Sequence, residues 1–387
     1  MTARHVLTFA QSPGRGGVER AQLRLCAGWA QAGRRVTLVL GRADDGFRPP
    51  TGVHIVELGS TDLLELRRLA SVVRALAPDL IFCPGNHYTG MAALLRLRLR
   101  DACPPIVAKM SSTTSRGDHG PVLDRLHAAW LRTHGRFLDR LVCMTPATAR
   151  AADRALGMGG RVHVIANPPT RPDPDAPPVL LLPGRVVLGV GRLVGQKRWD
   201  RLVDALPRLP DDVRLVLLGE GPERSTLEAR ARSLRVAHRV HLPGHAPCPL
   251  PAMARAALVA LPSDFEGAPG VLREALSVGT PVVATDVSSA IREIVADGSQ
   301  GDVVPRGDAE ALLAALNRRL RPDAPRPTPV PQPGEDAVKR YLQLFDGLVA
   351  ARLAPNRHPG LVPGSIALRV LTSGGTRRVM DPGTSPG

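Results

Sequence analysis

Two glutamates eight residues apart carry the strongest chemical signal in the sequence. Glu266 and Glu274 lie in the segment P-S-D-F-E-G-A-P-G-V-L-R-E-A, residues 262–275. A helix that has Pro269 as its first residue would direct its free amides and its positive end at an anion beside both carboxylates. Such a site suits a diphosphate joined to hydroxyl-rich groups, namely a ribose and a sugar. The alternative is that Glu266 caps the helix and that Glu274 is an ordinary solvated residue.

Two cations precede this segment. Arg192 and Lys197 stand in V-G-R-L-V-G-Q-K, residues 190–197, directly after a short apolar run that predicts a strand. Arginine presents a bidentate fork to phosphate oxygens, and lysine adds a mobile point charge. Lys197 is one of only three lysines among 51 basic residues, so compositional drift is an incomplete explanation for it. The alternative is a pair of surface cations.

A glycine-rich turn follows the first predicted strand. In S-P-G-R-G-G-V-E-R, residues 12–20, Gly16 and Gly17 allow a ligand to approach the backbone at the start of a helix. The segment lacks the third glycine of a dinucleotide-binding fingerprint, and no acidic residue ends the next strand. A simple tight turn is the alternative.

The elements that must position these residues alternate between strand and helix. Short apolar runs predict strands at 4–10, 35–40, 54–57, 79–83, 106–110, 140–144 and 161–166, and then at 186–191, 214–219, 240–242, 258–261 and 281–285. Helical spacing predicts helices at 18–32, 63–77, 91–98 and 121–138, further helices between the later strands, and one at 308–319. This alternation is typical of parallel sheets covered on both faces.

Two proline-rich segments divide the chain. Residues 167–183 contain seven prolines and residues 321–334 contain six, which predicts two linkers. We therefore expect an α/β protein with two doubly wound, Rossmann-like domains that face a cleft, where ligands bind at the carboxyl ends of the strands. The predicted units are a first domain over 1–168, a second over 184–320, a trailing helix over 335–354 that packs back on the first domain, and a disordered tail over 356–387.

Composition excludes several classes of protein. The net charge is +16; residues 1–170 hold 23 basic and 12 acidic side chains, a balance of +11, which leaves 28 and 23, or +5, for the rest. A basic first half suits an anionic membrane, an anionic acceptor or nucleic acid, but an aromatic content of 3% argues against nucleic acid. Five scattered cysteines argue against a disulfide framework or a zinc site and fit a reducing cytosol. No apolar run approaches 18 residues, so no membrane-spanning helix is expected.

Together these motifs resemble the retaining, nucleotide-sugar-dependent glycosyltransferases of family 4, which have the GT-B fold. The resemblance is densest over residues 186–320, where G-R-L-x-x-x-K, L-L-G-E-G-P, H-L-P-G, L-P-S-D-F-E-G-x-P-x-V-L-x-E-A and G-T-P-V-V-A-T-D follow in family order. The first half shares G-G-V-E-R at 16–20 and I-A-N-P at 165–168. The resemblance implies that the first domain binds the acceptor and the second binds the nucleotide sugar.

By matching positions, the resemblance also implies roles for individual residues. Arg192 and Lys197 would bind the donor diphosphate, Glu274 the ribose hydroxyls, and Glu266 the donor sugar. The remaining expected contacts are backbone contacts to the phosphates from Ala268, Gly270 and Val271, and contacts where donor and acceptor meet from Gly16 and Gly17. Cationic side chains and helix ends would neutralise the diphosphate, so no metal or other cofactor is expected.

One position departs from the family pattern. Many members carry a histidine after the strand predicted at 106–110, where this chain has Lys109 followed by Met-Ser-Ser. His87, after the preceding strand, is the nearest candidate for a catalytic histidine. Lys109 is a second candidate for the same role, and a transferase without activity is the third reading.

We expect a retaining hexosyltransferase that acts on a glycan or lipid-linked acceptor in cell-envelope or exopolysaccharide biosynthesis. It would lie in the cytoplasm, peripheral to the inner face of the membrane and without nucleic acid. The expected catalytic residues are Arg192, Lys197, Glu266 and His87. The alternatives are a sugar-nucleotide epimerase or hydrolase on the same fold, and a non-catalytic basic protein that binds nucleic acid with steep salt dependence.

Overall fold

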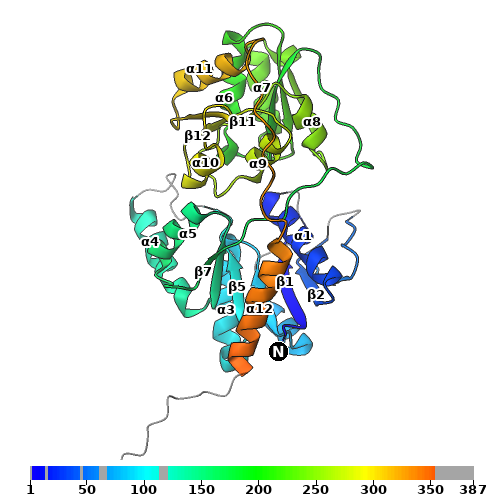
Figure 1. Cartoon of the computed structure of the whole chain (residues 1–387), viewed down its shortest axis with the longest axis vertical. Helices are drawn as coiled ribbons and strands as arrows, with labels where there is room; N and C mark the ends of the chain where they lie inside the picture. Colours follow the sequence, from blue (N-terminus) through cyan, green and yellow to red (C-terminus); the bar gives the residue numbers. More distant parts are fainter. Residues whose placement is uncertain (1, 14–15, 44–46, 61–67, 113–120, 354–387) are drawn as a thin grey trace, which may run out of the picture.

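The computed structural model describes residues 2–13, 16–43, 47–60, 68–112 and 121–353. Within this part of the chain, two parallel sheets covered by helices form two domains, one above the other in Figure 1. The predicted α/β fold with two doubly wound domains is therefore confirmed. The predicted tail over 356–387 and the first residues of the helix predicted at 63–77 lie outside the described residues.

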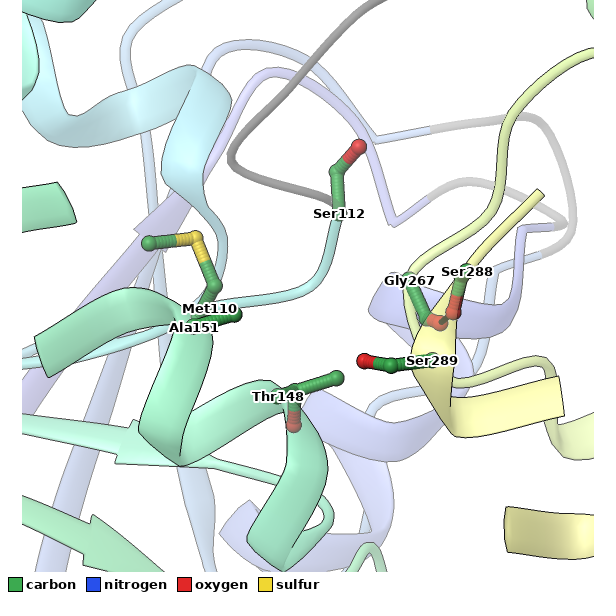
Figure 2. Close-up of a pocket in the computed structure, with 7 residues that line it drawn as sticks. All are labelled: Met110, Ser112, Thr148, Ala151, Gly267, Ser288 and Ser289. Atoms are coloured by element: carbon green, nitrogen blue, oxygen red, sulfur yellow. Dashed lines mark hydrogen bonds between the residues drawn. The ribbon is translucent and has the colours of Figure 1, made fainter. Parts of the chain in front are cut away.

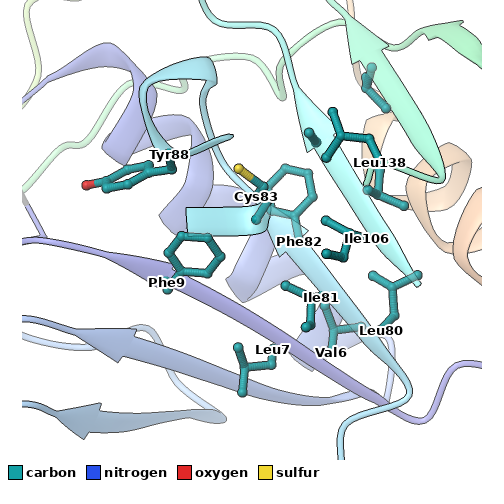
Figure 3. Close-up of a cluster of buried hydrophobic side chains, with 14 of the residues drawn as sticks. Val6, Leu7, Phe9, Leu80, Ile81, Phe82, Cys83, Tyr88, Ile106 and Leu138 are labelled. Atoms are coloured by element: carbon teal, nitrogen blue, oxygen red, sulfur yellow. The ribbon is translucent and has the colours of Figure 1, made fainter. Parts of the chain in front are cut away.

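The N-terminal sheet is built on strands that are buried on both faces, as continuous apolar runs in a parallel sheet require. Figure 3 shows side chains of β1, β4 and β5 packed into its core. In the described part of the domain the strand order is β3-β2-β1-β4-β5-β6-β7. The strands are β1 (His5–Ala10), β2 (Arg35–Leu40), β3 (Val53–Glu57), β4 (Leu80–Cys83), β5 (Ile106–Lys109), β6 (Arg140–Cys143) and β7 (Val162–Val164).

The helices of this domain come from both ends of the chain. Five connect its strands: α1 (Gly17–Gln31), α2 (Leu69–Leu76), α3 (Thr89–Leu99), α4 (Pro121–Thr133) and α5 (Pro146–Leu156). The sixth, α12 (Ala337–Leu353), returns from the second domain and packs on the first sheet (Figure 1). The second domain is thus inserted between β7 and α12 of the first.

An aromatic cluster holds α12 in place. Trp29 of α1 meets Phe345 of α12 at a centroid distance of 5.1 Å, and Phe82 of β4 meets Tyr341 of α12 at 5.5 Å, both edge to face. Trp29 and Phe82 also contact each other at 5.1 Å. The sequence has 11 aromatic side chains, namely three Trp, two Tyr and six Phe. Four of them make these contacts. The last helix is therefore an integral part of the N-terminal core.

The C-terminal sheet repeats the same plan. Its described strands are ordered β10-β9-β8-β11-β12-β13, all parallel. They are β8 (Arg185–Val190), β9 (Val213–Leu218), β10 (Val240–Gly244), β11 (Leu258–Leu261), β12 (Val282–Thr285) and β13 (Gly301–Val304). The helices are α6 (Asp200–Ala205), α7 (Arg224–Ser233), α8 (Leu250–Arg255), α9 (Gly270–Ser277), α10 (Ser289–Ile294) and α11 (Ala309–Arg319).

Two crossing segments join the domains and lie side by side. The backbone N–H of Thr170 donates to the side-chain oxygen of Gln332 at 2.9 Å, and the Gln332 amide donates back to the Thr170 carbonyl at 3.1 Å. At Gly334, φ is +94° and a Cβ would lie 2.2 Å from the carbonyl oxygen of Asn167, so only glycine fits there. The two proline-rich segments are therefore clamped together.

Several elements differ from those that the sequence predicts. The helix expected over 121–138 ends at Thr133, with a short 3₁₀ turn at His134–Arg136. The sequence patterns predicted none of α5, α10 and β13. The start of α5 carries a clear cap, in which Thr145 and Thr148 bond reciprocally and Pro146 occupies the first helical position. The buried face of α5 has helical spacing but consists mostly of small residues, Ala149 and Ala152 with Leu156, and β13 is short with a charged Asp302.

All five cysteines are buried and free. Each is held within one of the two domain cores rather than in a covalent cross-link.

Truncating Phe345 to alanine is expected to lower the free energy of unfolding by about 3–5 kcal/mol, because it opens a cavity in the aromatic cluster. Tyr341→Phe serves as the matched control. The Tyr341 hydroxyl is buried without a hydrogen-bond partner among the described residues, so its removal should leave stability unchanged or slightly higher. Urea unfolding followed by circular dichroism measures both. Equal losses in the two variants would contradict the packing described.

Candidate functional site

A cleft of about 790 Å³ opens between the two domains at the carboxyl ends of their strands. Its walls follow β1, β4 and β5 in the N-terminal domain and β8 and β11 in the C-terminal domain. All ten residues predicted for the site line it: Gly16, Gly17, His87, Arg192, Lys197, Glu266, Ala268, Gly270, Val271 and Glu274. Residues up to about 260 positions apart in sequence thus share one cavity.

One member of the predicted cation pair meets one member of the predicted acid pair. Lys197 Nζ lies 2.7 Å from Glu266 Oε1, and both side chains are largely buried. The same carboxylate oxygen accepts a hydrogen bond from Ser263 Oγ at 2.6 Å. A buried charge needs a partner and further hydrogen bonds. Glu266 has both, from Lys197 and from Ser263.

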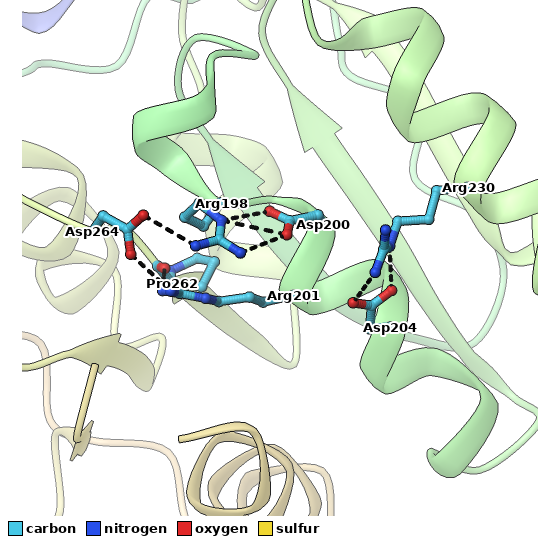
Figure 4. A network of polar contacts seen from close by, with 7 residues as sticks. All are labelled: Arg198, Asp200, Arg201, Asp204, Arg230, Pro262 and Asp264. Atoms are coloured by element: carbon cyan, nitrogen blue, oxygen red, sulfur yellow. Dashed lines mark hydrogen bonds and ion pairs between the residues drawn. The ribbon is translucent and has the colours of Figure 1, made fainter. Parts of the chain in front are cut away.

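A network of ion pairs behind the cleft fixes the two loops that carry this pair (Figure 4). Asp264 binds Arg201 at 2.7 Å and Arg198 at 3.1 Å, and Arg198 also binds Asp200 at 2.9 Å. The hydrogen bonds that Arg198 donates to Asp200 and Asp264 raise the pKa of Arg198 above its usual value. Sequence reasoning did not assign Asp264 a role. Its place two residues before Glu266 was the available signal.

Helix α9 presents its N-terminus to the cleft. Pro269 has extended backbone angles and is the N-cap residue, so the helix begins at Gly270, one residue later than predicted. The amides of Gly270 and Val271 lie in the first turn and have no intrahelical acceptor. Ala268, Gly270 and Val271 therefore place backbone donors and the positive helix end at the cleft wall.

Glu274 lies one turn further into the same helix and is almost fully buried. Its Oε1 accepts a hydrogen bond of 2.6 Å from Thr170 Oγ1, which belongs to the crossing segment. Thr170 Oγ1 in turn accepts from Arg24 Nη1 of helix α1 at 3.0 Å. Glu274 Oε2 and Arg24 Nε are buried without a hydrogen-bond partner in the described structure. Sequence reasoning identified Glu274 but neither Thr170 nor Arg24, which belong to no motif.

The N-terminal wall carries the glycine turn and His87. Gly16 is the N-cap residue of α1, and a Cβ there would lie 2.4 Å from Glu19 Oε2, so glycine leaves room for that carboxylate. His87 packs on Tyr88 with a centroid distance of 3.9 Å. Burial lowers the pKa of His87 despite the nearby carboxylate of Glu19, and the positive charge of Arg192 lowers it further. A neutral imidazole therefore faces the cleft near pH 7.

Lys109 lies behind this wall, at the end of β5. Its side chain is 1% exposed, and its Nζ donates to Asn167 Oδ1 at 3.2 Å. Burial lowers the pKa of Lys109 to about 8, although Glu19 favours the charged form. Lys109 itself does not line the cleft, but its partner Asn167 does. It reaches the site through Asn167 rather than directly.

The two domains touch beside the cleft at Gly267. A Cβ on this residue would lie 2.4 Å from the carbonyl oxygen of Ser111, so the contact requires glycine. Figure 2 shows the small cavity next to it, about 30 Å³, with Thr148 and Ala151 opposite Ser288 and Ser289. Ser288 Oγ donates to the Gly267 carbonyl at 2.5 Å and holds the loop in position.

The described residues contain no group of three or more His, Cys, Asp or Glu side chains placed to hold a metal ion. None of the described helices combines the length and apolarity needed to cross a bilayer.

Comparisons with known proteins agree with the two-domain division. A family model described as "Glycosyl transferase 4-like domain" matches residues 16–168, and one described as "Glycosyl transferases group 1" matches residues 184–321. The phosphatidyl-myo-inositol mannosyltransferase of Mycobacterium leprae is 32% identical over 265 residues, which cover 66% of this chain and 68% of that protein.

Other relatives match over a smaller share of their length. A lipopolysaccharide core biosynthesis glycosyltransferase of Rhizobium meliloti, LpsE, is 34% identical over 47% of this chain and 54% of its own length. An exopolysaccharide phosphotransferase of Streptomyces coelicolor is 32% identical over 57% of this chain and 24% of its own length. The chain therefore spans about half or less of these two relatives.

Solved structures share the fold. Anabaena HepE, solved in complex with UDP and glucose, superposes with a TM-score of 0.67 at 19% identity, covering 90% of this chain and 99% of that one. Together with the two matched domains and the mannosyltransferase relative, this places the chain in the GT-B glycosyltransferase superfamily, with a glycosyl transferase 4-like domain followed by a group 1 glycosyl transferase domain.

Proposed function

We propose that this protein transfers a hexose from a nucleoside diphosphate sugar to an acceptor hydroxyl with retention of anomeric configuration, as in glycosyltransferase family 4. The observation that carries the proposal is the convergence of Lys197, Glu266 and Glu274 with the start of α9 in one cleft. Relatives named for lipopolysaccharide core and glycolipid synthesis support a role in cell-envelope or exopolysaccharide assembly.

Each wall of the cleft has a part in the proposed reaction. Arg192, Lys197 and the α9 amides bind the donor diphosphate and stabilise the charge that develops on it as the sugar leaves. No metal is required in this proposal, because these groups supply the positive charge. Glu266 orients the donor sugar, and Glu274 accepts from the ribose hydroxyls. The departing phosphate takes the proton of the acceptor hydroxyl, which approaches from the N-terminal wall.

The acceptor is proposed to be a glycan or a lipid-linked molecule at an anionic membrane surface. Helix α4 supports this: Val122, Leu123, Leu126 and Trp130 are 66%, 55%, 62% and 37% exposed. Three exposed arginines lie on this helix or just after its end: Arg125, Arg132 and Arg136. They form no ion pair with any described residue. An exposed apolar face flanked by cations is the pattern of a helix that lies in a membrane interface. The proposed location is the cytoplasmic side of the cell membrane.

Removal of either key side chain should abolish nucleotide binding. In buffer with EDTA, we expect UDP or GDP to raise the melting temperature of the wild type, and Glu274→Ala and Lys197→Ala to lose that shift. The physical reason is the loss of charge-assisted contacts, each contributing about 1.5–3 kcal/mol. Each shift is measured against the variant's own melting temperature, because Lys197→Ala also leaves Glu266 without its partner.

Glu310→Gln is the matched control, since Glu310 is an exposed carboxylate on α11, far from the cleft in the fold. Retained shifts in both cleft variants would contradict the site. A shift that appears only when Mg²⁺ is added would contradict metal-free binding. Fast breakdown of the sugar nucleotide without acceptor would favour the hydrolase alternative.

Lys109→Met is expected to raise stability and lower activity together. The folded protein depresses the pKa of this lysine, so the unfolded chain binds the proton more tightly, and stability rises with pH from about 8 to the ordinary lysine value near 10.4. Methionine removes the buried charge, which should raise the free energy of unfolding at pH 7 and flatten its pH dependence in that window. Turnover should fall at least 10-fold if the buried ammonium supplies charge to the site.

The control is Lys339→Met on α12, an exposed lysine away from the cleft, which should change neither property. His87→Ala is measured in parallel. A fall in turnover for His87→Ala with none for Lys109→Met would assign the catalytic role to the imidazole alone.

Replacing Leu123 and Leu126 by serine should weaken binding to anionic vesicles about 10-fold, because the two exposed side chains no longer enter the interface. Sedimentation with phosphatidylglycerol vesicles measures the partition. The control is Leu180→Ser, since Leu180 is 73% exposed but lies on the crossing segment. Equal partition of the wild type onto neutral and anionic vesicles would remove the electrostatic part of the proposal.

A further inference from the structure

One threonine hydroxyl joins three parts of the chain at the floor of the cleft. Thr170 on the crossing segment donates to Glu274 of the C-terminal domain at 2.6 Å and accepts from Arg24 of the N-terminal domain at 3.0 Å. All three residues line the cleft. The positive charge of Arg24 is close enough to interact with the carboxylate of Glu274. The contact therefore spans both domains through a single oxygen atom.

Glu274 and Arg24 stand at the two ends of this series of hydrogen bonds, and each has one polar atom without a partner in the described structure. Glu274 Oε2 and Arg24 Nε are buried, and neither has a hydrogen-bond partner among the described residues. A buried carboxylate oxygen and a buried guanidinium N–H that lack partners cost the protein stability. One is an acceptor and the other a donor, so a ligand that fills both must offer a hydroxyl hydrogen and an acceptor oxygen. Two neighbouring hydroxyl groups meet this requirement.

The hydroxyl between them is held firmly in position. Gln332 bonds both the N–H and the carbonyl of Thr170, and its amide also donates to Ser277 Oγ of α9 at 3.1 Å. Thr170 thus has a fixed position relative to α9, while Arg24 approaches from α1 in the other domain. Burial lowers the pKa of Arg24, and the carboxylate of Glu274 opposes this shift.

We propose that Arg24, Thr170 and Glu274 form an interdomain relay that recognises the ribose cis-diol of the donor nucleotide. One ribose hydroxyl donates to Glu274 Oε2, and the neighbouring hydroxyl oxygen accepts from Arg24 Nε. Thr170 orients both side chains and is a positioning residue. The N-terminal domain thereby contacts the donor, and nucleotide binding ties the two domains together. This inference rests on the proposed nucleotide-sugar site and adds Arg24 to it.

The test compares each ribonucleotide with its 2′-deoxy form. Isothermal titration gives the dissociation constants of UDP, GDP, 2′-deoxy-UDP and 2′-deoxy-GDP for the wild type, and the tighter ribonucleotide and its deoxy form are used thereafter. We expect the wild type to prefer the ribonucleotide by about 10- to 100-fold, the range for a hydrogen bond to a charged group. Arg24→Gln and Thr170→Val should each reduce that preference to a few-fold, and Thr170→Ser should restore it.

The ratio of the two dissociation constants distinguishes recognition from general structural damage, which would weaken both ligands alike. In the double variant the losses should not add, because both substitutions break one relay. Arg171→Gln is the control; its arginine follows Thr170 directly but is exposed and pairs with Glu335. It should behave as the wild type.

Three outcomes are decisive. An unchanged ratio in Arg24→Gln and Thr170→Val, with tight binding of the ribonucleotide, would overturn the relay and leave the proposed function standing. A wild type that binds neither UDP nor GDP would overturn the proposed function and the relay with it. A ratio lost in Arg24→Gln and Thr170→Val but kept in Thr170→Ser and Arg171→Gln would establish the relay.

Discussion

The buried ion pair between Lys197 and Glu266 is the constraint on which the rest of the site depends. Two opposite charges can leave water together only if each is also held by other partners. Ser263 supplies a hydrogen bond to the carboxylate, and Asp264 ties the loop to Arg198 and Arg201 on the segment that follows Lys197. The ion pairs of Asp264 outside the cleft thus hold the two loops so that Lys197 and Glu266 meet inside it. Helix α9 begins four residues beyond Glu266 and inherits its place from the same loop.

The second feature of the site is that neither domain completes it alone. Lys197, Glu266 and Glu274 belong to the C-terminal domain, whereas His87, Lys109 and Arg24 belong to the N-terminal one. Gly267 lies so close to Ser111 of the other domain that a Cβ at position 267 would clash with the Ser111 carbonyl oxygen. The clamp between Thr170 and Gln332 then fixes the crossing segments beneath the cleft. Domain contact and site geometry are therefore set by the same few residues.

Much of this arrangement could be predicted from sequence because its signals are local. Strands β2 and β11 have the bounds expected from their apolar runs, and the paired glutamates stand in one short motif with a helix start between them. Arg24, Thr170 and Gln332 gave no signal. Their contacts join positions 104 to 162 residues apart, and in a linker or on a helix face their residue types are unremarkable. Long-range pairs of this kind depend on how the domains meet, which spacing does not encode. Short β13, with its charged aspartate, was missed because its burial comes from its neighbour β12.

The return of α12 to the first domain has a consequence for synthesis on the ribosome. Trp29 and Phe82 emerge early, but Tyr341 and Phe345, which cover them, emerge about 260 to 315 residues later. The inserted domain has its own core and can fold before they arrive. The N-terminal half therefore exposes the aromatic side chains of Trp29 and Phe82 until α12 leaves the exit tunnel. A nascent chain stalled before this point would be a target for chaperones, even though every motif of the cleft had already been made.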